Sequence, residues 1–203
     1  MRLIPPYLNI PVAEQNSDTP EAEPLTRLQI LIAMGVTAVV LLLIAKGWIY
    51  FGSVTLIPVK FSIEAILQGI ALGLVITVAS SITYRIWNAY RRSADYYLDL
   101  VLKPLLLPDL IWLGLLPGLS EELLFRGVML PEFGLNLEGI LISSLCFGVL
   151  HMNGLKQWAY IVWATVIGVA LGYSAVWTGN LLVPIIAHIC TNFVAGCVWK
   201  LSD

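Results

Sequence analysis

The sequence contains few charged residues and very few histidines for its length. Of its 203 residues, 12% are charged, against about 25% in an average soluble domain, and 59% are hydrophobic. Mean hydropathy is +0.86. The 11 lysines and arginines form no basic stripe, so no nucleic-acid partner is expected. This composition excludes a disordered chain and a soluble globule, and it predicts a multi-pass membrane protein.

Cysteine is also scarce. The chain has three cysteines, which are Cys146, Cys190 and Cys197. An odd number without CxxC spacing argues against a disulfide framework or a zinc ribbon. Residues 1–26 hold five prolines and four acidic side chains, without a charged segment leading into an apolar run. We expect a flexible acidic N-terminal tail here rather than a signal peptide, followed by a single transmembrane helical domain over 27–203.

Uncharged apolar runs predict the membrane helices. The first covers 28–45 and extends toward 51, the second covers 65–84, and a further apolar helix covers 139–155. Twenty residues at 1.5 Å each are enough to cross a hydrocarbon core of about 30 Å. Residues 157–199 form a stretch of 43 residues without Asp, Glu, Lys or Arg, which must fold back, with Thr178-Gly179-Asn180 as the turn. The predicted fold is an all-α membrane bundle of six to eight helices.

The segment 85–103 is the most polar part of the interior of the chain. It combines four basic residues with Trp87, Tyr90, Tyr96 and Tyr97. This mixture is typical of an interfacial loop or an amphipathic helix with an aromatic belt. By the positive-inside rule the segment is expected in the cytoplasm, and an even number of crossings places the N-terminus there too.

Two further patterns concern helix ends and helix packing. Pro108, Asp109 and Pro117 predict a broken apolar piece over 104–118, after which Ser120 is expected to cap a new helix. Two pairs of glycines, at 69/73 and 168/172, have the small-xxx-small spacing. Such pairs favour close helix packing within one chain, with homodimerisation as the alternative.

Ionisable residues remain inside the apolar helices. The chain has two histidines, His151 and His188, and both lie far from the polar loops. An ionisable side chain at membrane depth costs about 3 kcal/mol even on lenient scales, so each one indicates a function. Glu122 and Arg126 are four residues apart and can pair on one helix face. Glu121 is turned by about 100° from Glu122 and is left free to face a cavity as a general acid or base.

The surroundings of the two histidines are also patterned. Phe147 precedes His151 by one helical turn, which places an aromatic ring beside the imidazole. His188 and Asn192 are likewise one turn apart, so an imidazole and an amide share one face. Two such donors are suited to stabilising an oxyanion.

Three motifs thus stand in order on successive apolar segments: EExxxR at 121–126, FxxxH at 147–151 and HxxxN at 188–192. In this order they resemble the CPBP intramembrane protease family, which includes type II CAAX prenyl endopeptidases and the Abi proteins of bacteriocin processing and immunity. The resemblance covers about 105–200. It implies roughly eight helices around a conical intramembrane cavity and an endopeptidase acting near a protein C-terminus or processing site.

The resemblance also implies roles for the motif residues. Glu121 with His151 would activate water, while His188 and Asn192 would stabilise the oxyanion. Glu122 and Arg126 would orient the site. The expected partners are membrane lipids and a protein or lipidated-peptide substrate, with the oligomeric state left open.

Several alternatives accompany this interpretation. No cofactor is favoured, yet Glu121, His151 and His188 are three residues of the kind that bind zinc, with a fourth position left for water. A non-proteolytic membrane scaffold, chaperone or immunity factor is the second hypothesis. A small transporter with a proton relay is the third, and the absence of an obvious inverted repeat argues against it.

Overall fold

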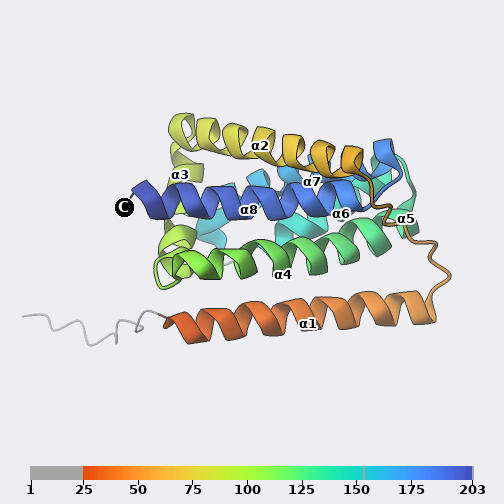
Figure 1. Cartoon of the computed structure of the whole chain (residues 1–203), viewed down its shortest axis with the longest axis horizontal. Coiled ribbons are helices and arrows are strands. Elements are labelled where there is room, and N and C mark those ends of the chain that lie inside the picture. The colour runs from red at the N-terminus through yellow and green to blue at the C-terminus, as the bar shows by residue number, and fades with distance from the viewer. Residues whose placement is uncertain (1–24, 153, 203) are drawn as a thin grey trace, which may run out of the picture.

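The chain folds into a bundle of helices joined by loops, shown as a computed structural model in Figure 1. The structure describes residues 25–152 and 154–202, so nearly all of the predicted tail over 1–26 lies outside the described residues. The helices are α1 (Arg27–Phe51), α2 (Ile63–Ile86), α3 (Asn88–Tyr97), α4 (Leu110–Glu122), α5 (Leu130–Phe133), α6 (Leu137–Leu150), α7 (Trp158–Thr178) and α8 (Leu182–Ser202). The predicted all-α helical bundle is confirmed.

Short tighter or wider turns connect several of these helices. The turns η1 (Leu98–Leu102) and η3 (Leu123–Met129) are π-helical, while η2 (Leu107–Asp109) and η4 (Leu155–Gln157) are 3-10 turns. Four helical stretches of the described part are long and apolar enough to cross a membrane: α1, α2, η4 with α7, and α8. The pair Asn88–Leu102 and Leu107–Phe133 is bent by 106° and makes a fifth crossing if it is counted as one span.

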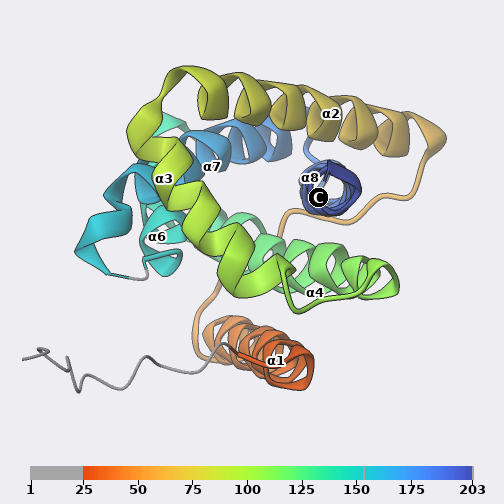
Figure 2. The ribbon, with the colours of Figure 1, turned by 90° about the vertical axis from the view of Figure 1, so that its left-hand side faces the viewer.

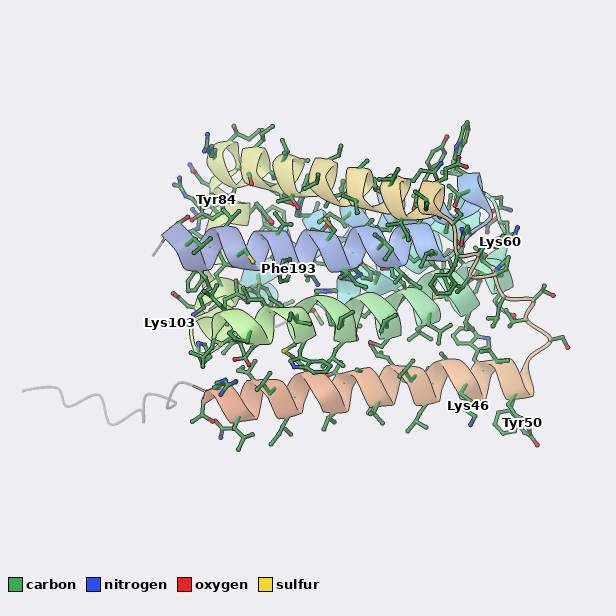
Figure 3. All side chains as sticks on the ribbon, viewed as in Figure 1. Lys46, Tyr50, Lys60, Tyr84, Lys103 and Phe193 are labelled. Carbon is green, nitrogen blue, oxygen red and sulfur yellow. The ribbon has the colours of Figure 1, made fainter. Side chains whose placement is uncertain are left out.

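The bundle has a central helix and a peripheral one. Helix α8 packs against both α2 and α4, and α6 packs against α7 behind them (Figure 1). Helix α1 lies on the outer side of α4 and η3, and Lys46 and Tyr50 point away from the bundle (Figure 3). A salt bridge of 2.6 Å between Arg27 Nε and Asp109 Oδ2 fastens the start of α1 beside the start of α4.

Helix α3 lies across one end of the bundle, as the view along the helices shows (Figure 2). Its residues belong to the polar segment 85–103, for which an interfacial loop or an amphipathic helix was predicted. The structure shows the amphipathic helix, and its position at the membrane interface stays a prediction. The start of α1 lies at the same end (Figure 1). This agrees with the expectation that the two share one side of the membrane, and their cytoplasmic placement stays a prediction.

Local sequence explains where the helices begin and turn. Side-chain oxygens of Thr26, Ser62 and Asn136 accept hydrogen bonds from the first free backbone N–H groups of α1, α2 and α6. The predicted turn between α7 and α8 is confirmed, with Gly179 at φ +57° in the left-handed region. Asn180 Oδ1 accepts from the N–H of Leu182 at 3.0 Å, which stabilises the start of α8.

The predicted break before Ser120 is wrong. Pro117 lies inside α4, and Ser120 donates its hydroxyl to the carbonyl of Leu116 at 2.7 Å instead of capping a helix. Proline lacks only one donor and is tolerated when other groups satisfy the carbonyl that it leaves free. The sequence pattern overstated the strength of proline as a helix stop in an apolar bundle.

The two glycine pairs are used inside the chain. A Cβ added at Gly69 would lie 2.6 Å from Ile186 Cβ of α8, and one added at Gly73 would lie 2.7 Å from the Ala187 carbonyl oxygen of the same helix. A Cβ at Gly168 or Gly172 would approach side chains of α6 to 3.0 and 3.3 Å. Both pairs therefore let two helices of one chain approach closely, which confirms the intrachain interpretation.

Candidate active site

Glu121 and Glu122 close α4 at the point where it widens into the π-helical turn η3. The N–H of Leu130 bonds to the carbonyl of Phe125, five residues back, which is the signature of this wider turn. Such turns are frequent at functional sites. Both carboxylates are buried, with side-chain exposures of 9% for Glu121 and 0% for Glu122.

Glu122 is the centre of a buried polar cluster. Arg126 Nη1 donates to Glu122 Oε1 at 2.8 Å, so the predicted i,i+4 pair is confirmed. His188 Nδ1 lies 2.7 Å from the same oxygen. Arg126 also donates through Nη2 to the carbonyl of Gly168 at 3.0 Å, and its guanidinium lies 4.4 Å from the centre of the Phe147 ring. These contacts pair two opposite charges that are wholly removed from solvent, while Glu122 Oε2 and Arg126 Nε have no hydrogen-bond partner among the described residues.

His151 is held by a different set of contacts. It follows the last residue of α6, and its Nδ1 lies 2.9 Å from the carbonyl of Phe147, one turn earlier. The Phe147 ring centre lies 4.8 Å from that of the imidazole, as the FxxxH spacing predicts. The hydroxyl of Tyr97, on α3, donates to the backbone carbonyl of His151. The Tyr160 ring of α7 lies on another side, at 6.1 Å.

The remaining ring nitrogens converge on Glu121. Oε2 of Glu121 lies 3.9 Å from Nε2 of His151 and 4.0 Å from Nε2 of His188. This oxygen is buried and has no hydrogen-bond partner within the described residues. The predicted grouping of Glu121, His151 and His188 is thus present in the structure, and it joins α4, α6 and α8.

Hydrogen bonding fixes the tautomers of both neutral imidazoles. A carbonyl oxygen and an ionised carboxylate can only accept, so Nδ1 carries the proton in each ring. Nε2 of His151 and Nε2 of His188 are then acceptors when the rings are neutral, and they become donors only when the rings are protonated. Both acceptors face the unpaired oxygen of Glu121.

The spacing of these three atoms fits a water molecule better than zinc. Glu121 Oε2 and His151 Nε2 are 3.9 Å apart. A water oxygen placed about 2.8 Å from each of them would make an angle of about 90° between the two hydrogen bonds, which water tolerates. Zinc bonds of about 2.1 Å in tetrahedral geometry place ligand atoms about 3.4 Å apart. The donor types suit zinc, but both separations from Glu121 Oε2 are about 0.5 Å too long. In the described part of the chain no group of three such side chains has metal-binding geometry.

Asn192 lies one turn beyond His188 but is engaged elsewhere. Its Nδ2 donates to the backbone carbonyl of Leu113 at 3.4 Å, a long hydrogen bond. That carbonyl is free because the residue four positions later is Pro117, which has no N–H. The structure therefore gives Asn192 a packing role that its sequence spacing did not suggest, and its oxyanion role stays a prediction.

The predicted intramembrane cavity also stays a prediction. One cavity of about 580 Å³ lies between the 53–58 loop and α5. Another of about 300 Å³ lies between α3 and η4. Neither is lined by Glu121, His151 or His188. The imidazole of His151 is 24% exposed, whereas the side chains of Glu121 and His188 are 9% and 8% exposed.

Four contacts of the site were not predicted from the sequence. Tyr97 was expected only in an aromatic belt, and its contact with His151 joins residues 54 positions apart. Tyr160 and the carbonyl of Gly168 carry no local signal at all. The bond between Glu122 and His188 spans 66 positions, so spacing along one helix could not reveal it.

The fold and the site together define an integral membrane protein with a buried glutamate that faces two histidines. Residues 103–194 match the family model described as type II CAAX prenyl endopeptidase Rce1-like. The matched segment, which contains all three motifs, is therefore similar to the type II CAAX prenyl endopeptidases that this model describes. The resemblance inferred from the three motifs is thereby confirmed, and α1, α2 and α3 lie outside the matched segment.

A similar protein is known from Bacillus subtilis (strain 168). It is the "uncharacterized protein YpbD", which is 40% identical over 91 residues. The aligned part covers 45% of this chain and 46% of the length of that protein. No solved structure matches the chain.

Proposed function

We propose that this protein is an intramembrane endopeptidase of the CAAX type, which hydrolyses a peptide bond of a membrane-associated protein or peptide. The observation that carries the proposal is the unpaired Oε2 of Glu121, buried between the Nε2 atoms of His151 and His188. A buried polar atom without a partner is rare, and at a functional site it indicates a water molecule or a substrate group.

In the proposed reaction Glu121 is the general base. A water molecule between the side chains donates one hydrogen to Glu121 Oε2 and the other to Nε2 of His151, which is an acceptor in the tautomer described above. Its lone pair then attacks the carbonyl carbon of the scissile bond while Glu121 takes a proton. A tetrahedral intermediate forms, and the carbonyl oxygen becomes an oxyanion.

The oxyanion is assigned to the α8 side of the site. His188 can donate from Nε2 only as an imidazolium, because its Nδ1 proton is directed to Glu122. The two carboxylates at positions 121 and 122 and the single guanidinium of Arg126 leave one negative charge beside the His188 ring. Asn192 supplies a second donor once its long bond to Leu113 is exchanged for the oxyanion.

Collapse of the intermediate completes the reaction. The bond from carbon to the leaving nitrogen breaks, and the proton held by Glu121 passes to that nitrogen. One product ends in a new carboxylate and the other begins with a new amine. Glu122 and Arg126 stay in contact throughout and act as positioning residues, because they hold the ring of His188 in place.

Cleavage by the purified protein in detergent tests this function. We would supply peptides that carry a C-terminal CaaX sequence with and without a prenyl group, and detect products by mass spectrometry. Glu121→Gln is expected to abolish cleavage, whereas Glu138→Gln, which changes an exposed carboxylate at the start of α6, is expected to leave it intact. Equal rates for wild type and Glu121→Gln would contradict the proposed base.

The same variant separates the scaffold hypothesis from catalysis. If a deletion strain is complemented by Glu121→Gln as well as by wild type, the cellular role is not proteolytic. Zinc content and chelator sensitivity of the purified protein address the metal alternative. Stoichiometric zinc that is lost together with activity would show that the three side chains move closer than in this structure.

A further inference from the structure

A second site on the molecule lies between α3 and η4, where a cavity of about 300 Å³ opens. One face of α3 supplies residues 89, 92, 93 and 96 to its wall, and the other wall is formed by 156–158. The spacing of the α3 residues is that of a single helix face. The cavity is therefore a built feature of the packing between two elements that are distant in sequence.

The charged residues of this cavity are both cations. Arg92 comes from α3 and Lys156 from η4, and no acidic side chain lines the cavity. In the described part of the chain neither cation has an ion-pair partner within 4 Å. Arg27, by contrast, is bonded to Asp109 through two of its nitrogens. An uncompensated pair of cations in one hollow favours an anion.

The position of the cavity indicates which anion can reach it. Helix α3 lies across the end of the bundle, and η4 lies beside it at the perimeter (Figure 2). Lys103 and Tyr84 mark the same end in Figure 3. Trp158 lines the cavity and is half exposed, as tryptophans at the membrane interface are. The cavity thus opens at the level of the lipid headgroups.

We propose that this cavity binds the phosphate of an anionic phospholipid. Arg92 offers a planar fork for two phosphate oxygens, Lys156 adds a point charge, and the indole of Trp158 packs against the glycerol region. Basic pockets between membrane helices recognise lipid headgroups in this way. The volume is at the lower end of that of small-ligand sites and suits a headgroup rather than a whole lipid. The proposal is independent of the peptidase function.

Direct binding to the full chain in a neutral detergent tests the proposal. The probes are dioctanoyl phosphatidylglycerol, dioctanoyl phosphatidylcholine and inorganic phosphate, and the readout is bound lipid by native mass spectrometry. The wild type is expected to bind phosphatidylglycerol at least tenfold more tightly than phosphatidylcholine. In Arg92→Gln/Lys156→Gln this ratio is expected to fall to about one.

A matched control removes the same charge from the same end of the bundle. Arg91→Gln/Lys103→Gln changes two exposed cations that do not line the cavity, and the preference is expected to survive. The single variant Lys156→Gln changes one exposed residue of a short turn, and it serves if the double variant does not fold. It is expected to reduce the preference by several fold.

Three results would overturn the proposal. Equal loss in both double variants would mean that net charge alone attracts the lipid. Displacement of phosphatidylglycerol by an equal concentration of inorganic phosphate would identify a free anion as the ligand. In the third, the protein binds a peptide with a free C-terminal carboxylate through Arg92 and Lys156 but does not bind phosphatidylglycerol. This result would identify the cavity as a substrate subsite.

Discussion

The two histidines of the site are held in the same orientation by two regions of opposite character. His188 lies in a dry region of α4, α7 and α8, where Glu122 and Arg126 are fully buried and paired. His151 lies at the end of α6, where a backbone carbonyl, a tyrosine hydroxyl and aromatic rings surround it. In both regions Nδ1 is bonded and Nε2 faces Glu121. Buried charge fixes one ring, and neutral packing at a more open position fixes the other.

The difference predicts that the charged region is more sensitive to mutation. Removing one partner of a buried ion pair leaves the other charge uncompensated, which costs about 3–5 kcal/mol. Arg126→Ala is therefore expected to lower the free energy of unfolding by about that amount and to abolish cleavage. Thermal unfolding in detergent measures the effect, with the exposed Arg91→Ala as the control. A loss below about 1 kcal/mol would contradict the importance of the pair.

Variants of Asn192 can show whether this residue acts in catalysis or only in helix packing. If its amide stabilises the oxyanion, Asn192→Ala lowers kcat by about 10² to 10³ with little change in KM. If it only satisfies the carbonyl of Leu113, it lowers stability, and Pro117→Ala removes that loss because the restored N–H can bond to the same carbonyl. Single and double variants, measured for cleavage and for unfolding, distinguish the two. We expect the kcat effect to persist in the Pro117→Ala background.

Glu122→Gln keeps the shape of the buried cluster and removes its negative charge. The amide can present an N–H to His188 in place of an acceptor, so the ring loses the fixed tautomer and the counter-charge of its imidazolium. We expect kcat to fall by about 10²-fold, with little change in KM. An unchanged kcat would show that His188 does not need this carboxylate.

Tyr97 tests the neutral region, where the effect should be smallest. Tyr97→Phe removes one hydrogen bond to the carbonyl of His151, which is worth about 0.5–1.5 kcal/mol. Cleavage is expected to fall by several fold through kcat, at constant KM. Tyr50→Phe is the matched control, because Tyr50 points away from the bundle (Figure 3). A loss of kcat as large as that of Glu122→Gln would show that the neutral region matters as much for cleavage as the charged region.

Sequence reasoning succeeded where contacts are local or where apolar runs are long. The helices near 28–51 and 65–84, the turn at Gly179 and the pairs Glu122–Arg126 and Phe147–His151 all follow from spacing along one element. Motif order grouped Glu121 with the two histidines, although their roles in catalysis stay a prediction.

Contacts between distant elements were out of reach. The carboxylate of Glu122 on His188 and the hydroxyl of Tyr97 on His151 depend on how helices pack, and no periodicity encodes them. The expected helix start at Ser120 failed for a related reason. The carbonyl freed by Pro117 is satisfied by Asn192, which is 79 positions away from Leu113, so a local rule about proline could not apply.

The π-helical turn η3 affects which changes in chain length the site can accept. This turn contains one residue more than an α-helical path would use, as the bond from Leu130 to Phe125 shows. Deleting a single residue between 123 and 125 would remove this extra residue and reduce the spacing of Glu122 and Arg126 from four residues to three. Arg126 would then move by about 100° around the helix, away from the face that holds Glu122. The identity of residues in this segment can change, but we expect the number of residues to stay constant among proteins that keep the glutamate pair.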